Sequence, residues 1–189
     1  MIFYYLDASA WVKRYYWESG TRWVQDLFAQ NPAIACASLG LIEVMAPLAR
    51  KRKARDIDLL SFQQKAQELE EDWMDFIQIQ LTAETINRTK DLARDMALRG
   101  AAAVHLASAL VLQSRLVDAE DRLIFVAADR ELKEALKRPV WLSSIQKNKS
   151  DRRCPMLGME PRKKTKHSRT LVNSGIQHPL SGSHSLLNL

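Results

Sequence analysis

The chain has 189 residues, of which 47% are hydrophobic, enough to form one domain with a tail or one larger domain. No apolar run approaches the roughly 20 residues of a membrane-spanning helix. The first ten residues lack a basic leader and reach an acid at Asp7, so we expect no signal peptide. The two cysteines, Cys36 and Cys154, make a poor disulfide framework, which favours a reducing, cytoplasmic setting.

The net charge of +6 is concentrated in the C-terminal segment. Residues 147–189 contain nine Lys or Arg and two Asp or Glu, whereas residues 1–146 contain 19 and 20. Nucleic-acid affinity within 1–146 would therefore need a local basic patch or bound metal ions. Beyond residue 146 no periodicity is visible. We therefore predict a folded domain over 1–146 and a basic, disordered tail over 147–189, with one weak local element at most.

Strands and helices are predicted to alternate along the first 146 residues. Strands are expected at 2–6, 34–36, 76–81 and 123–127, with a last edge strand at 139–142. Helices are expected from Ser9 to about Glu18, from Thr21, from Ser38, from Asp56 to about Asp75, from Thr82 to about Leu98, over 101–114 and from Asp129. Pro47 is expected to interrupt the third helix or to lie near its first turns, and Gly100 to break the run before 101. This alternation predicts an α/β domain with a mainly parallel sheet covered on both faces.

Three acidic residues stand at or near the carboxyl ends of predicted strands, the edge where open α/β sheets carry their active sites. Asp7 ends the first strand, Asp129 follows the fourth by two residues, and Glu43 lies on the helix after the second. Clustered carboxylates need cations to neutralise them, and hard oxygen ligands favour Mg²⁺ or Mn²⁺. Taken singly, Asp129 is better explained as a helix cap, and Glu43 fits a solvated helix stripe as well as a functional site.

Four segments resemble the motifs of PIN domains, in the family's order and at sensible spacing over about residues 1–142. They read LDASAWVKRY (6–15), SLGLIEVMAPLAR (38–50), LRGAAAVHLASAL (98–110) and FVAADRELKEAL (125–136). The chain is thus similar to VapC-type toxins of toxin–antitoxin systems. The resemblance implies a Rossmann-like PIN fold with four or five mainly parallel strands, and RNA cleavage that depends on Mg²⁺ or Mn²⁺. It also implies an antitoxin partner and often a homodimer.

The third motif lacks the acid that the family carries three residues before the histidine. Here the histidine is His105 and the position of the acid is Ala102. Losing one carboxylate of four should weaken divalent-cation binding and cleavage. Asp95 lies about 10 Å lower along a continuous helix, so neither Asp95 nor Asp91 is expected to substitute. Both engineered inactivation and natural decay explain the alanine, and the unpatterned tail weakly favours decay.

The resemblance assigns roles to the remaining site residues. Asp7, Glu43 and Asp129 are the expected catalytic and metal-binding acids. Ser9 is expected to support the site by holding a metal-bound water or the scissile phosphate, to cap its helix, or both.

Several basic residues near these motifs have two interpretations. Lys13 and Arg14 lie one turn beyond Asp7 and either contact the RNA backbone or belong to a solvated face. The run 50–55, RKRKAR, is better explained as a solvated helix end than as the border of a substrate groove. His105 is interpreted as a structural helix residue.

The sequence therefore predicts a metal-dependent endoribonuclease, the toxin of a toxin–antitoxin pair, weakened because Ala102 replaces an expected catalytic Asp. The alternative is a non-catalytic protein of the PIN fold that binds antitoxin or RNA without cleaving. A third interpretation makes the basic tail a nucleic-acid binder.

Overall fold

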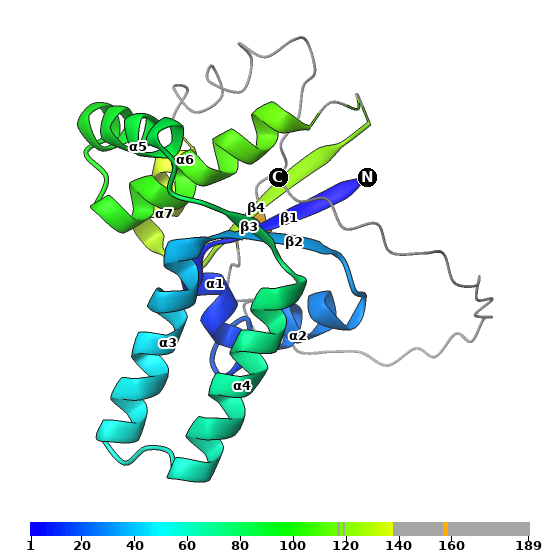
Figure 1. The fold of residues 1–189 in the computed structure, drawn as a ribbon, viewed down its shortest axis with the longest axis vertical. Coiled ribbons are helices and arrows are strands. Elements are labelled where there is room, and N and C mark those ends of the chain that lie inside the picture. The colour runs from blue at the N-terminus through cyan, green and yellow to red at the C-terminus, as the bar shows by residue number, and fades with distance from the viewer. Residues whose placement is uncertain (117, 119, 138–156, 159–189) are drawn as a thin grey trace, which may run out of the picture.

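A computed structural model describes residues 1–116, 118, 120–137 and 157–158 (Figure 1). Its strands are β1 (Ile2–Leu6), β2 (Ala33–Ala37), β3 (Ile77–Ile79), β4 (Arg122–Ala127) and β5 (Leu157–Gly158). Its helices are α1 (Ala8–Trp11), α2 (Thr21–Ala29), α3 (Ser38–Lys53), α4 (Leu59–Asp75), α5 (Ala83–Met96), α6 (Gly100–Arg115) and α7 (Arg130–Leu136), and the 3₁₀ turn η1 (Val12–Arg14) follows α1. No helix in this described part has the length and apolar character needed to cross a membrane.

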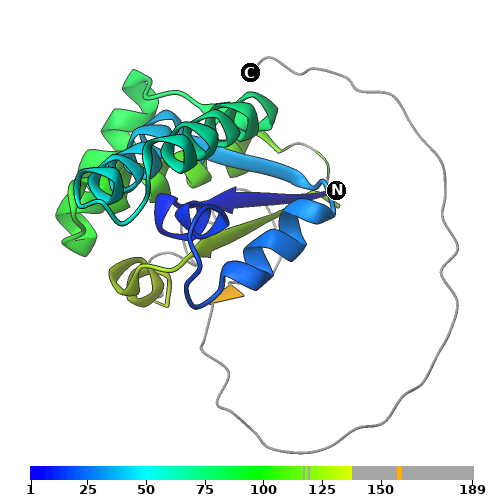
Figure 2. The same cartoon turned by 90° about the horizontal axis from the view of Figure 1, so that it is seen from below.

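The five strands form one sheet in the order β3-β2-β1-β4-β5, and every pairing is parallel. Tyr4 at the centre pairs with Ile34 of β2 and with Ile124 of β4. Figure 2 shows β2, β1 and β4 running side by side. The α/β fold with a mainly parallel sheet is therefore confirmed. The expected edge strand at 139–142 lies outside the described residues, and the domain boundary at 146 stays a prediction.

The sheet separates two layers of helices. Helices α5, α6 and α7 lie on one side, and α1 to α4 lie on the other, with α3 and α4 forming a hairpin that extends away from the sheet (Figure 1). Successive strand residues point to opposite faces. Tyr5 and Phe125 accordingly belong to the apolar cluster with α5 to α7, whereas Leu6 and Val126 belong to the cluster with α1, α2, α3 and α4.

The first two helices begin differently from the prediction. The N-cap of α1 is Asp7 and not Ser9, because the Asp7 carboxylate accepts a hydrogen bond from the Ser9 N–H (3.0 Å). Helical structure ends with η1, short of the expected Glu18, whose N–H donates to the Thr21 hydroxyl (2.9 Å). Thr21 is therefore the first residue of α2, and Gly20, at φ 95°, precedes it as the cap.

Helices α3 and α4 correct two further boundaries. Helix α3 runs through Pro47 to Lys53, although Pro47 has no N–H to donate to a helical carbonyl. Buried residues of α3 on both sides of the proline, Val44 and Leu48, hold the helix in place. Helix α4 starts later than expected because the carboxylate of Asp58, and not Asp56, caps it by accepting the Ser61 N–H (2.7 Å).

The break before α6 lies earlier than expected. Thr82 caps α5 as predicted, but the helix ends at Met96 and Ala97 adopts the left-handed conformation at φ 55°. Gly100 then begins α6, with Arg99 as its N-cap. Both sides of this break matter for the site, because α6 carries the third motif.

Candidate active site at the carboxyl edge of the sheet

Asp7 is fixed where β1 ends. Its backbone N–H donates to the Val126 carbonyl (2.9 Å), which continues the β1–β4 pairing by one residue. The residue is 5% exposed. One carboxylate oxygen accepts hydrogen bonds from the N–H and the hydroxyl of Ser9, and the other lies 3.5 Å from Nε2 of His105. Asp7 is therefore a buried carboxylate that helix α1 and helix α6 both contact.

Glu43 reaches the same histidine from α3. Its Oε2 lies 2.7 Å from Nε2 of His105. The close approach of α3 depends on Gly40, one turn before Glu43. A Cβ at Gly40 would lie 2.3 Å from Sγ of Cys36 and 3.2 Å from Cε1 of His105. The close packing therefore favours a glycine where α3 passes the ring.

His105 lies at the centre of these contacts, and its ring is buried. Its Nδ1 is 3.0 Å from the Tyr5 hydroxyl, and that hydroxyl accepts the Ala37 N–H at 3.1 Å. Burial raises the pKa of the Tyr5 hydroxyl well above its usual range, so the group stays neutral. The interpretation of His105 as a structural helix residue missed its contact with two of the predicted acids.

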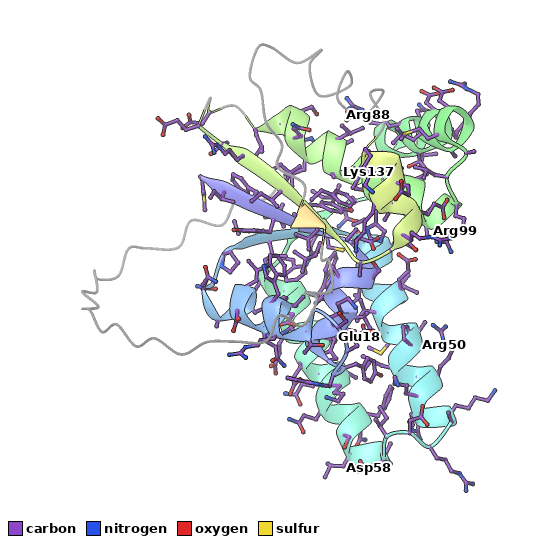
Figure 3. The ribbon with its side chains drawn as sticks, turned by 180° about the vertical axis from the view of Figure 1, so that it is seen from behind. Glu18, Arg50, Asp58, Arg88, Arg99 and Lys137 are labelled. Atoms are coloured by element: carbon purple, nitrogen blue, oxygen red, sulfur yellow. The ribbon has the colours of Figure 1, made fainter. Side chains whose placement is uncertain are left out.

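Asp129 is held differently, as the N-cap of α7. One carboxylate oxygen accepts the Leu132 N–H (3.0 Å), and the other accepts a hydrogen bond from Nη2 of Arg99 (2.9 Å). Arg99 also donates to Glu131 from its side chain and, at 2.8 Å, from its backbone N–H. Figure 3 shows Arg99 at the start of α6, beside α7. Hydrogen bonds from Arg99 lower the pKa of Glu131, and Glu131 raises the pKa of Arg99.

Ser9 connects the two strand ends. Its hydroxyl oxygen accepts the N–H groups of Ala128 and Asp129, each at 2.9 Å, and its proton is donated to Asp7. A hydroxyl has one donor and two acceptor positions, so its capacity is filled. The prediction that Ser9 supports the site stays open, but here its hydroxyl joins Asp7 to the backbone of Asp129.

Ala102 lies between the residues that bind these acids. Arg99, Ala102 and His105 follow one another at intervals of three on α6, so they share one helix face. Ala102 is 7% exposed and packs in the apolar cluster. Sequence reasoning missed Arg99, although its spacing from Ala102 was a usable signal.

The two acids that were not expected to replace the missing one do point elsewhere. Asp91 and Asp95 both pair with Arg94 on α5, at 3.2 and 2.8 Å. The two candidate RNA contacts also have partners within the chain. Lys13 is buried and pairs with Glu18 (3.0 Å), and Arg14 pairs with Asp72.

The donor set accommodates a divalent cation in part. Nowhere in the described ranges are three or more His, Cys, Asp or Glu side chains placed to hold a metal ion. Asp7 and Glu43 do converge on one nitrogen, and Mg²⁺ is commonly held by one or two carboxylates while it keeps several waters. These two residues therefore fit such an ion, whereas the Asp129 carboxylate is directed toward Arg99.

Parallel strands with carboxylates at their carboxyl ends define the class of fold that the four motifs predict. No protein-family model matches the chain. It is 38% identical over 112 residues to Ribonuclease VapC45 and to Ribonuclease VapC49 of Mycobacterium tuberculosis, strains CDC 1551 / Oshkosh and ATCC 25618 / H37Rv respectively. The match covers 57% of this chain and 75% of each relative. The chain belongs to the VapC family of PIN-domain toxins.

Proposed function

We propose that this chain is an endoribonuclease of a toxin–antitoxin pair whose cleavage is weak because Ala102 replaces an acid. The relatives named as ribonucleases support the reaction class. The observation that carries the proposal is the convergence of Asp7 and Glu43 on one buried nitrogen at the carboxyl edge of the sheet. Asp7 is buried and Glu43 is partly buried, and two carboxylates that approach the same atom repel each other, an arrangement typical of a functional site.

The proposed cofactor is Mg²⁺ or Mn²⁺, held by Asp7 and Glu43, with Asp129 as a third ligand once it leaves Arg99. When bound, such an ion activates water and stabilises the charge that develops on the phosphoryl group. The protein supplies orientation. Ser9 fixes Asp7 by two hydrogen bonds, and the approach of α3 at Gly40 brings Glu43 to the same point.

The proposed partners are an RNA substrate and a cognate antitoxin protein, with a homodimer as the assembly and the cytoplasm as the location. The name VapC of the two relatives supports the toxin assignment.

A second function is favoured by the contacts that the acids already make within the chain. Arg99 is hydrogen-bonded to Asp129, His105 is hydrogen-bonded to Glu43, and position 102 has an apolar side chain. A chain in this state keeps the family's surface and binds antitoxin or RNA without cleaving. The two functions differ in whether an acid at position 102 restores cleavage.

The deciding experiment compares Mn²⁺-dependent RNA cleavage by the full chain and by its Ala102→Asp variant. We expect the variant to cleave at least about 100-fold faster, the size of effect that one charged or polar group contributes at a phosphoryl or acyl transfer site. The control is Asp7→Asn in the Ala102→Asp chain, which should abolish the gain.

Each outcome separates the hypotheses. Cleavage by the variant alone supports a nuclease with one lesion. Equal cleavage by both chains would show that the acids present suffice, so that Ala102 does not weaken the enzyme. If neither chain cleaves any RNA, the binding function replaces the nuclease.

A further inference from the structure

The family resemblance assigns no role in the site to the ring of His105. We propose that His105 is a positioning residue, whose Nε2–H preassembles the Asp7–Glu43 carboxylate pair before any metal or RNA binds. The inference rests on the proposed function, since it concerns the residues assigned there to the cation. It goes beyond the proposed function because a side chain of the protein, and not a bound cation, holds the two carboxylates together.

The proton on Nε2 follows from what the nitrogen faces. Its two neighbours are carboxylate oxygens, and an ionised carboxylate only accepts hydrogen bonds. A bare nitrogen lone pair at 2.7 Å from Glu43 Oε2 would be repelled. Nε2 therefore carries a proton and donates it to Glu43. Asp7, at 3.5 Å, lies beyond good hydrogen-bond length, so the N–H attracts its carboxylate electrostatically while Ser9 holds it by two hydrogen bonds.

The opposite side of the ring fixes its orientation. Nδ1 contacts the Tyr5 hydroxyl at 3.0 Å, and the Ala37 N–H at the end of β2 donates to that hydroxyl at 3.1 Å. These contacts link the backbone of β2, a side chain of β1, the ring on α6 and the carboxylate on α3. The position of Glu43 is thus set by the sheet through the ring, and not by α3 alone.

The ring is closely surrounded. His105 is 1% exposed, and its Cε1 faces Gly40, where a Cβ would lie at 3.2 Å. A residue that only filled this space would need no donor toward Glu43. Groups that orient metal-binding carboxylates typically change metal affinity about 10- to 100-fold when they are removed.

The first test needs neither metal nor activity. Nitrogen-15 NMR of the full chain should show a slowly exchanging proton on Nε2 of His105, and Glu43→Ala should make that proton exchange faster. Glu70→Ala, an exposed acid on α4, is the matched control and should leave the signal unchanged. An Nε2 without a bound proton, or a signal that Glu43→Ala does not alter, would overturn the proposal.

The second test measures Mn²⁺ affinity in two polar variants of the full chain. The amide nitrogen of His105→Gln reaches the place of Nε2, whereas that of His105→Asn reaches only the place of Nδ1. We expect His105→Asn to bind Mn²⁺ about 10- to 100-fold more weakly and His105→Gln to stay within a few-fold of the parent. Circular dichroism and urea unfolding check that both variants fold.

Two results of this second test would count against the proposal, and a third would count against the proposed function alone. Equal affinities in both variants would show that the ring only fills space. Tighter binding by His105→Asn would show that His105 competes with the cation. If the parent binds no Mn²⁺, the metal assignment of the proposed function fails, and the NMR result alone decides whether His105 positions the carboxylates.

Discussion

The two halves of the candidate site hold their acids by opposite means. On the β1 side, Asp7 and Glu43 both contact the ring of His105, which is 1% exposed and is held by a hydrogen bond with Tyr5 of the sheet. On the β4 side, Asp129 pairs with Arg99, whose side chain is 70% exposed. Exposed ion pairs contribute little and are screened by salt, whereas buried hydrogen-bonded groups are costly to disturb. We therefore expect the β1 half to be rigid and the β4 half to rearrange more easily, with Ala102 between them.

The largest effect is expected where the halves join. Ser9→Ala removes the acceptor of two backbone N–H groups, those of Ala128 and Asp129, and a donor to Asp7. We expect the free energy of unfolding to fall by about 2 kcal/mol or more, because each unpaired donor costs about 1–3 kcal/mol. Urea unfolding measures it. Ser114→Ala, whose hydroxyl donates only within its own helix, is the control and should change little.

A smaller loss is expected from Gly40→Ala, which tests the rigid half. The added Cβ meets Cys36 Sγ and the His105 ring, so the unfolding free energy should drop by about 1–3 kcal/mol. Gly100→Ala adds the same methyl group where nothing lies within 4 Å and should keep or raise stability. Adding Cys36→Ala to Gly40→Ala should recover part of the loss. Equal stability of the Gly40 and Gly100 variants would contradict the close packing of α3 on α6.

The smallest effect is expected from Arg99→Gln, which tests the exposed half. Its guanidinium pairs with Asp129 and Glu131 in water, so the urea midpoint should not move measurably, with or without added salt. Asp129→Ala is the comparison, because it also removes the cap of α7 and should lower the midpoint. A loss in Arg99→Gln as large as that in Gly40→Ala would mean that the two halves are equally rigid.

Sequence reasoning located the acids because the rule for parallel sheets needs only strand order and strand ends. Asp7, Glu43 and Asp129 do lie near the carboxyl edge, while their catalytic roles stay predictions. The partners of these acids were missed for a physical reason. His105 reaches Glu43 only because Gly40 lets α3 pass close to α6, and Arg99 reaches Asp129 only because α7 lies beside the start of α6. Such contacts between distant segments leave no periodic trace in the sequence.

The predicted helix boundaries were wrong for two reasons, local capping and tertiary packing. Asp7, and not Ser9, is the N-cap of α1 because its carboxylate accepts a hydrogen bond from the Ser9 N–H. Helix α3 continues past Pro47 because packing of Val44 and Leu48 outweighs one missing hydrogen bond. Tertiary packing thus allows a helix to continue where a proline in the sequence suggests that it ends.

The small residue at position 102 has a consequence for the gene. An alanine codon that ends in a pyrimidine becomes an aspartate codon by a single base change. His105 and Arg99, on either side of the position, already contact Glu43 and Asp129. Under the proposed function, one point mutation would turn a gene for a weak nuclease into a gene for a toxin, which a cell tolerates only when it also makes the antitoxin. The frequency of Ala102→Asp mutants among surviving cells that lack the antitoxin would then measure how strongly the cell selects against this acid.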